Sequence, residues 1–146
     1  MSEDDQSYLV VLRFGARDPL TQSALADRGF DVVEHRGLRS RPDPDGDHGF
    51  NVALPAESHS EHFDELWLAV IEWLRSLEEI NRGYRERTGQ SDVELDIGVF
   101  PADDFIRNHR IPCADLAFLA QAHIELCLSV YHAAPRRRAS ADSSPE

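Results

Sequence analysis

The sequence predicts an α+β domain with a ferredoxin-like fold, in which split β-α-β units give the order βαββαβ and a C-terminal helix and strand extend it. Five short segments carry apolar residues at every second position, as strands do, and three longer segments repeat them at helical spacing. Along the chain these segments follow the order β, α, β, β, α, β, α, β. We therefore expect a mostly antiparallel sheet with its helices mainly on one face.

The N-terminal elements have clear local signals. Residues 8–14 carry apolar side chains on both faces, which predicts a central strand. Asp18 followed by Pro19 is typical of a helix start and predicts a helix that ends before Gly29. The remaining expectations in this part are a helix over residues 19–27, strands over 30–35 and 50–54, and a Gly- and Pro-rich loop over 37–49.

The longest helical pattern covers about residues 60–87, with a capping-box spacing at Ser58 and Glu61 before it and Gly89 after it. One side of this helix is expected to build the core. Its apolar stripe consists of Phe63, Leu66, Trp67, Val70, Ile71, Trp73, Leu74, Leu77, Ile80 and Tyr84. The opposite side carries Glu61, Glu65, Glu72, Glu79 and Glu86.

The C-terminal half contains the most regular alternation. Residues 93–100 predict a strand whose odd-numbered residues point inward and whose Glu94 and Asp96 point outward. Pro112 favours the start of a helix over about residues 113–124, and a last strand is expected over 125–131.

Length and composition indicate one soluble domain. A chain of 146 residues is long enough to bury a core, and we expect a single domain over residues 7–134 between disordered tails at 1–6 and 135–146. We found no apolar segment that is long enough for a membrane span or a secretory signal, so a cytoplasmic location is expected. Cys113 and Cys127 are expected to be reduced thiols, because the predicted elements do not bring them together.

The net charge of −12 comes from 27 acidic and 15 basic residues. Such a balance opposes nucleic-acid binding, which depends on cations that contact phosphates. It suits either solubility alone or a basic protein partner.

We expect no metal, no cofactor and no catalytic residues. Asp43, Asp45 and Asp47 alternate like the start of a calcium loop, but the later positions of that motif do not follow, so a solvated turn is the better interpretation. His48, His59 and His62 lie near one another in the sequence, although a strand separates the first from the others.

Two surfaces are candidates for binding. Glu61, Asp64 and Glu65 lie in the first turns of the long helix, and with Glu94 and Asp96 they are the residues expected to contact a basic partner. On the sheet face that the helices leave open, Leu9, Val11 and Tyr131 form an apolar centre suited to a homodimer interface. Arg13 and Tyr131 are the alternative residues, for a small molecule in the groove between sheet and helices.

Three C-terminal segments, residues 93–100, 113–123 and 124–131, resemble the C-terminal half of the bacterial domain of unknown function 4279 family, and the resemblance extends over about residues 8–131. It implies a small bacterial α+β domain and supplies no catalytic residues. It also leads us to expect a small residue with glycine where this chain has Ala122 and His123.

These features predict a non-enzymatic interaction domain. Small acidic domains of this class resemble immunity proteins, so the most concrete expectation is a domain that neutralises a basic bacterial toxin or partner by steric occlusion. The alternative is a regulatory domain that binds a small molecule.

Overall fold

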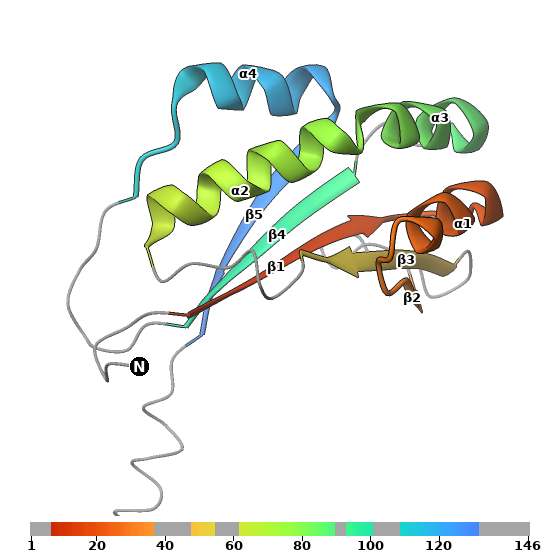
Figure 1. Ribbon diagram of the computed structural model, residues 1–146, viewed down its shortest axis with the longest axis horizontal. Helices are drawn as coiled ribbons and strands as arrows, with labels where there is room; N and C mark the ends of the chain where they lie inside the picture. The colour runs from red at the N-terminus through yellow and green to blue at the C-terminus, as the bar shows by residue number, and fades with distance from the viewer. Residues whose placement is uncertain (1–6, 37–47, 55–61, 90–92, 101–108, 132–146) are drawn as a thin grey trace, which may run out of the picture.

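A computed structural model describes residues 7–36, 48–54, 62–89, 93–100 and 109–131. It shows an α+β architecture with a five-stranded mixed sheet and four helices among these residues (Figure 1). The strands are β1 (Ser7–Phe14), β2 (Val33–Arg36), β3 (His48–Ala53), β4 (Val93–Phe100) and β5 (Ile124–Val130). The helices are α1 (Pro19–Asp27), α2 (Phe63–Ser76), α3 (Glu78–Thr88) and α4 (Cys113–Gln121). In the part of the chain described, no helix combines the length and the apolar character that a membrane crossing needs.

The sheet is built around β1. Its strand order is β2-β3-β1-β4-β5, so the first strand of the chain occupies the centre, as its apolar residues on both faces predict. β1 pairs antiparallel with β3 and with β4, and β2 pairs antiparallel with β3. β5 pairs parallel with β4, and α4 forms the crossover between them.

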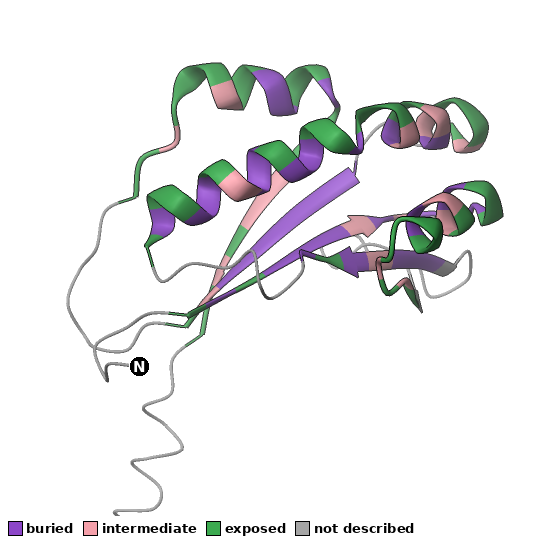
Figure 2. Cartoon of the chain, in the orientation of Figure 1, coloured by how far each residue is buried: buried purple, intermediate pink, exposed green. Residues whose placement is uncertain are grey.

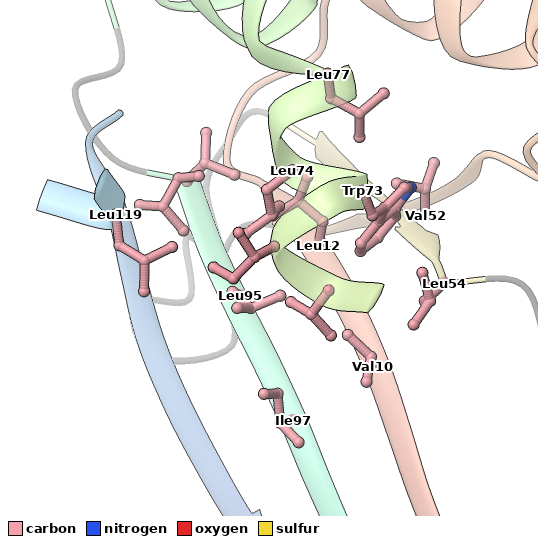
Figure 3. Close-up of a cluster of buried hydrophobic side chains, with 14 of the residues drawn as sticks. Val10, Leu12, Val52, Leu54, Trp73, Leu74, Leu77, Leu95, Ile97 and Leu119 are labelled. Carbon is pink, nitrogen blue, oxygen red and sulfur yellow. The ribbon is translucent and has the colours of Figure 1, made fainter. Parts of the chain in front are cut away.

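The helices cover one face of the sheet, and the core lies beneath them. The even-numbered side chains of β1 point to this layer: the Tyr8 ring lies 6.0 Å from that of Phe63 on α2, and the Phe14 ring 4.9 Å from that of Tyr84 on α3. Buried residues follow the facing surfaces of sheet and helices (Figure 2). Figure 3 shows the centre of this core, with Val10, Leu12, Val52, Leu54, Leu95 and Ile97 from the sheet side and Trp73, Leu74, Leu77 and Leu119 from the helix side.

The long helix expected over residues 60–87 is in fact two helices, α2 and α3, joined at Leu77. The Ser76 hydroxyl donates a hydrogen bond to the Trp73 carbonyl at 2.6 Å, and the Leu77 amide bonds to Leu74 three residues back rather than to residue 73. A serine that bonds to a nearby carbonyl competes with the helical ladder and bends a helix. Periodicity does not reveal this break, because the buried stripe continues through Leu77 to Tyr84.

A second set of contacts ties α1 to α3. Asp18 caps α1 by accepting a hydrogen bond from the Thr21 amide, and its carboxylate accepts two more from Arg87 on α3, at 3.1 Å from Nε and 2.9 Å from NH2. Burial alone would raise the pKa of Asp18, but the hydrogen bonds from Arg87 and Thr21 outweigh burial and hold the pKa below its ordinary value. In addition to the contacts between Asp18 and Arg87, the Ala16 amide donates a hydrogen bond to the buried Tyr84 hydroxyl at 2.8 Å.

The turn between α4 and β5 is longer than the sequence predicts, because residues 122 and 123 separate the two elements. The helix ends at Gln121 instead of about residue 124, and the strand begins at Ile124. Between them His123 adopts φ 58°, the left-handed conformation that glycine tolerates best. This is the position at which the family resemblance led us to expect a small residue with glycine.

Other predicted boundaries differ only at the ends of elements: β2 begins at Val33 instead of residue 30, and β3 begins at His48 instead of residue 50. The two predicted tails, the Ser58–Glu61 capping box and the three aspartates at 43, 45 and 47 lie outside the described residues.

Replacing Asp18 by alanine is expected to lower the free energy of unfolding by about 2 kcal/mol at pH 7, because a helix cap and charged hydrogen bonds are lost. The pKa of Asp18 is lower in the folded state than in the unfolded state. Its contribution to stability is therefore complete above the unfolded-state pKa of about 3.9, and it is lost as the pH falls through the folded-state pKa. In urea unfolding between pH 7 and pH 3, the difference in free energy of unfolding between the two proteins should become smaller only below about pH 4. Asp31→Ala, at an exposed position, is the control, and a gap that stays constant to pH 3 would contradict this assignment.

Replacing His123 by glycine is expected to stabilise the protein by up to about 1 kcal/mol, because glycine adopts the left-handed conformation without strain. His123→Ala removes the same exposed imidazole but keeps the Cβ, so it should give no gain. Thermal unfolding of the three proteins distinguishes these outcomes. Equal gains for both variants would show that the imidazole, not the backbone, is the source of any strain.

Candidate functional site

Four polar side chains meet on the sheet face opposite the helices. Arg13 of β1 lies beside Glu94 of β4, and Asp96 occupies the next position on that face, with Ser129 of β5 near it. Arg13 NH2 donates a hydrogen bond to Asp96 Oδ2 at 3.0 Å, and the Ser129 hydroxyl donates to Asp96 Oδ1 at 3.2 Å. We call Arg13, Glu94, Asp96 and Ser129 the polar cluster.

The carboxylates of the polar cluster are buried. Glu94 is 2% exposed and Asp96 4% exposed, so the expectation that they are solvated and available to a basic partner is wrong. Their direction was predicted correctly, because both point away from the helices. They lie on the strand between β1 and β5, where side chains of both neighbours flank them, and Arg13 already compensates part of their charge.

Charge compensation in the polar cluster is incomplete. Arg13 Nε lies 3.7 Å from Glu94 Oε1, which permits charge attraction but is too long for a hydrogen bond. Neither of these two buried atoms has a hydrogen-bond partner among the described residues. One guanidinium therefore serves two buried carboxylates, with a hydrogen bond to Asp96 and charge attraction alone to Glu94.

Tyr131 lies on the same face but far from Arg13. Its ring stacks on Phe100 at 4.8 Å and covers Gly98, where a Cβ would come within 3.1 Å of it. Gly98 follows Glu94 by four strand residues, about 13 Å, so Arg13 and Tyr131 do not share a site. The groove expected between sheet and helices does not contain them either, because both side chains lie on the open face.

The apolar centre expected on the open face is smaller than predicted. Val11 is buried beside Asp96, whereas Leu9 and Tyr131 are exposed and lie near the exposed Phe100. Both thiols are free: Cys113 is exposed, and Cys127 is half-buried with its sulfur 3.7 Å from the Ser129 hydroxyl.

The outer surface of α2 has a different character. Asp64, Leu68, Glu72 and Glu65 fall within an arc of about 100° on the helix, opposite its buried stripe. All four are exposed, and Leu68, at 65%, is the most exposed of the large apolar side chains described. We call these four residues the acidic α2 face. Asp64 and Glu65 occupy the first turn, where the helix dipole favours negative charge.

Arg75, the cation on the α2 helix, contacts an aromatic ring of α4. Arg75 follows on the same side of the helix, but its guanidinium lies 4.4 Å from the centre of the Phe118 ring on α4. Nearby, Trp67 donates to Asp115 at 2.8 Å, which holds α4 against α2. Glu61, the third acidic residue predicted for this surface, lies outside the described residues.

Leu68 is the residue that the sequence analysis missed. It falls off the apolar stripe of the helix and stands among acidic residues. An apolar residue on the charged side of an amphipathic helix is the signal that points to such a position.

The histidines and acids of the described residues form no group of three or more that would hold a metal ion. His62 is exposed just before α2, while the other members of the proposed histidine group are His59, which is not described, and His48, of which the backbone alone is described. Comparisons with family models, curated proteins and solved structures found no match for this chain. The resemblance noted in the sequence therefore stays a prediction.

Replacing Arg13 by leucine is expected to lower the free energy of unfolding by about 3 kcal/mol, because two buried carboxylates lose their cation. Arg17→Leu is the matched control: Arg17 pairs with Glu34 at 3.3 Å, but both side chains are largely exposed, so the loss should stay below about 1 kcal/mol. Chemical unfolding at pH 7 measures both. Equal effects of the two substitutions would show that the polar cluster is not a buried charge network.

Proposed function

We propose that this chain is a non-enzymatic interaction domain whose acidic α2 face docks a basic protein. The observation that carries the proposal is an exposed leucine surrounded by exposed carboxylates: Leu68, with Asp64, Glu65 and Glu72 around it. Of the five acids predicted for partner binding, Asp64 and Glu65 remain in this role. Glu94 and Asp96 leave it because they are buried.

The chemistry of this surface fits a basic partner. Interfaces gain most of their affinity from a few apolar or aromatic anchors that become fully buried, while the surrounding polar rim sets specificity. Leu68 supplies the anchor and the three carboxylates supply the rim. The net charge of −12 would attract a cationic protein over a distance and raise the rate of association.

The most concrete form of this function is immunity-like. A rigid domain that binds a basic bacterial toxin across its active surface neutralises it by steric occlusion, and it needs no chemistry of its own. The packing of α2 supports this form, because its inner side is anchored in the core through Leu66, Val70 and Leu74 and so presents the acidic face on a rigid element.

A second candidate function rests on the polar cluster. Arg13 Nε and Glu94 Oε1 are buried without hydrogen-bond partners among the described residues, and a small polar molecule that reached both atoms from the open face would satisfy them. This candidate is the small-molecule regulatory domain expected as the alternative, with its site moved from the groove to the open face. It ranks second because ion-pair attraction at 3.7 Å already compensates part of this charge.

We further propose that β1 to β4 with α1, α2 and α3 form a ferredoxin-like unit. The order β2-β3-β1-β4 with antiparallel neighbours supports this assignment, and α4 with β5 would be the extension expected from the sequence. We likewise propose that the chain belongs to the domain of unknown function 4279 family and has a cytoplasmic location.

The test uses three baits: the unchanged protein and two variants with the same change of charge. Asp64→Arg with Glu72→Arg alters the acidic α2 face, and Glu79→Arg with Glu86→Arg alters exposed positions on α3. Extracts of the source cell are passed over each bait at low salt. We expect a basic protein to be retained by the unchanged protein and the α3 variant but lost by the α2 variant.

The retained protein is then purified and its affinity measured at two salt concentrations. Charge reversal on α2 should weaken binding at least 100-fold, or about 2.7 kcal/mol, and added salt should weaken binding to the unchanged protein. Leu68→Ala should weaken it by about 1 to 3 kcal/mol without changing its salt dependence. Identical sets of retained proteins on all three baits would contradict the proposal and favour the second candidate.

A further inference from the structure

The β5 strand forms one edge of the sheet, and among the described strands only β4 pairs with it. The opposite edge, β2, covers four residues, and its Glu34 is held by Arg17 and by Gln22 from the segment around the start of α1. β5 covers seven residues with the sequence IELCLSV, of which Glu125 alone is charged. A long, mostly uncharged edge strand is a surface on which another strand can pair.

Two hydrogen bonds establish which backbone groups of β5 point outward. The Val93 amide donates to the His123 carbonyl at 3.0 Å, and the Tyr131 amide donates to the Val99 carbonyl at 2.9 Å. In a parallel pair, alternate residues direct both their N–H and C=O groups to the neighbour. Odd-numbered residues of β5 therefore bond to β4, and Ile124, Leu126, Leu128 and Val130 direct their backbone groups to the open edge.

The same edge exposes apolar side chains. Leu128 is 54% exposed and Val130 55% exposed, on the side of the sheet that bears the helices. Leu126 is half-buried and Ile124 is buried beside them. This stripe continues the apolar surface of the core to the edge of the sheet and stops there without cover from the described helices.

We propose that a second copy of this chain pairs with this edge: the two β5 strands run antiparallel about a two-fold axis through Cys127. Leu126 then lies opposite Leu128 of the second copy, and Ile124 lies opposite Val130. On the open face Glu125 lies opposite Ser129. The two five-stranded sheets join into one continuous sheet, which closes a symmetric dimer.

The sequence of β5 selects this register. Residues that form hydrogen-bonded pairs must both direct backbone groups outward, so even-numbered residues have to face even-numbered ones. Centring the pair on Cys127 meets this condition, uses all seven residues of each strand and keeps the two Glu125 carboxylates apart. A slip of two residues places Cys127 opposite Glu125 or Ser129 and leaves the ends of both strands unpaired.

The chemistry of the partner follows from complementarity on both faces. Every apolar residue of the helix-side stripe meets an apolar residue, and the single carboxylate of each strand faces an uncharged residue instead of the other carboxylate. The edge carries its own complement, so a second copy is the occupant that it fits. This interface lies on β5, apart from the acidic α2 face, and does not depend on the function proposed above.

The first measurement is the mass of the purified chain in solution. Sedimentation at tens of micromolar should give twice the 16.5 kDa mass of one chain. Leu128→Lys, or independently Val130→Lys, places a cation in the apolar stripe twice per dimer and should raise the dissociation constant at least tenfold. Both positions are exposed, so the chain should still fold, which circular dichroism checks. Leu68→Lys is the control at an exposed leucine of α2 and should leave the mass unchanged.

The second measurement reports the register. The two Cys127 residues form a non-hydrogen-bonded pair, with Cα atoms about 4.5 Å apart, so a short bismaleimide should add to one thiol of each copy and link them. The link should form in Cys113→Ser and be absent in Cys127→Ser. The proposal would be overturned if the chain were still a monomer at about 200 µM, or if the β5 substitutions left a dimer intact. Linkage through Cys113 instead of Cys127 would also overturn it.

Discussion

The two unlike faces of the central strand β1 organise the rest of the molecule. Its even-numbered residues pack against α2 and α3, while its odd-numbered residues place Arg13 among the carboxylates of β4. Because side chains alternate strictly along a strand, a shift of one residue in register would bring Arg13 into the core and Leu12 to the charge network. Burial on one face and charge pairing on the other therefore specify the same register.

The polar cluster is better understood as a determinant of specificity than as a source of stability. Buried ion pairs lose hydration that their attraction only partly restores, whereas loss of one member leaves an uncompensated charge. Arg13 reaches both carboxylates of β4, and Asp96 in turn accepts a bond from Ser129 on β5. Three adjacent strands are thus held in alignment by groups that would be unfavourable in any other arrangement.

The two surfaces proposed for association differ in kind. The acidic α2 face combines charge with one exposed leucine, which suits a partner of opposite charge and a rate of association that depends on salt. The β5 edge offers backbone groups and an apolar stripe, which suits a strand of matching pattern. One lies on a helix surface and the other at the sheet edge, so the two proposed interfaces use different residues.

The sequence by itself determined the element types, most of their ranges and the central place of β1. It also determined the inward and outward sides of α2 and β4, because hydrophobic periodicity and turn residues are local signals. Tertiary structure alone decided which groups meet: that Glu94 and Asp96 are buried against Arg13, that Tyr131 covers Gly98 far from Arg13, and that the long helix bends at Leu77. Burial of a charged side chain depends on its neighbours across the sheet, and the local hydrophobic periodicity does not determine the order of the strands. The same separation explains why Leu68 was overlooked: its position off the apolar stripe is visible in the sequence, but its exposure is a property of the assembled fold.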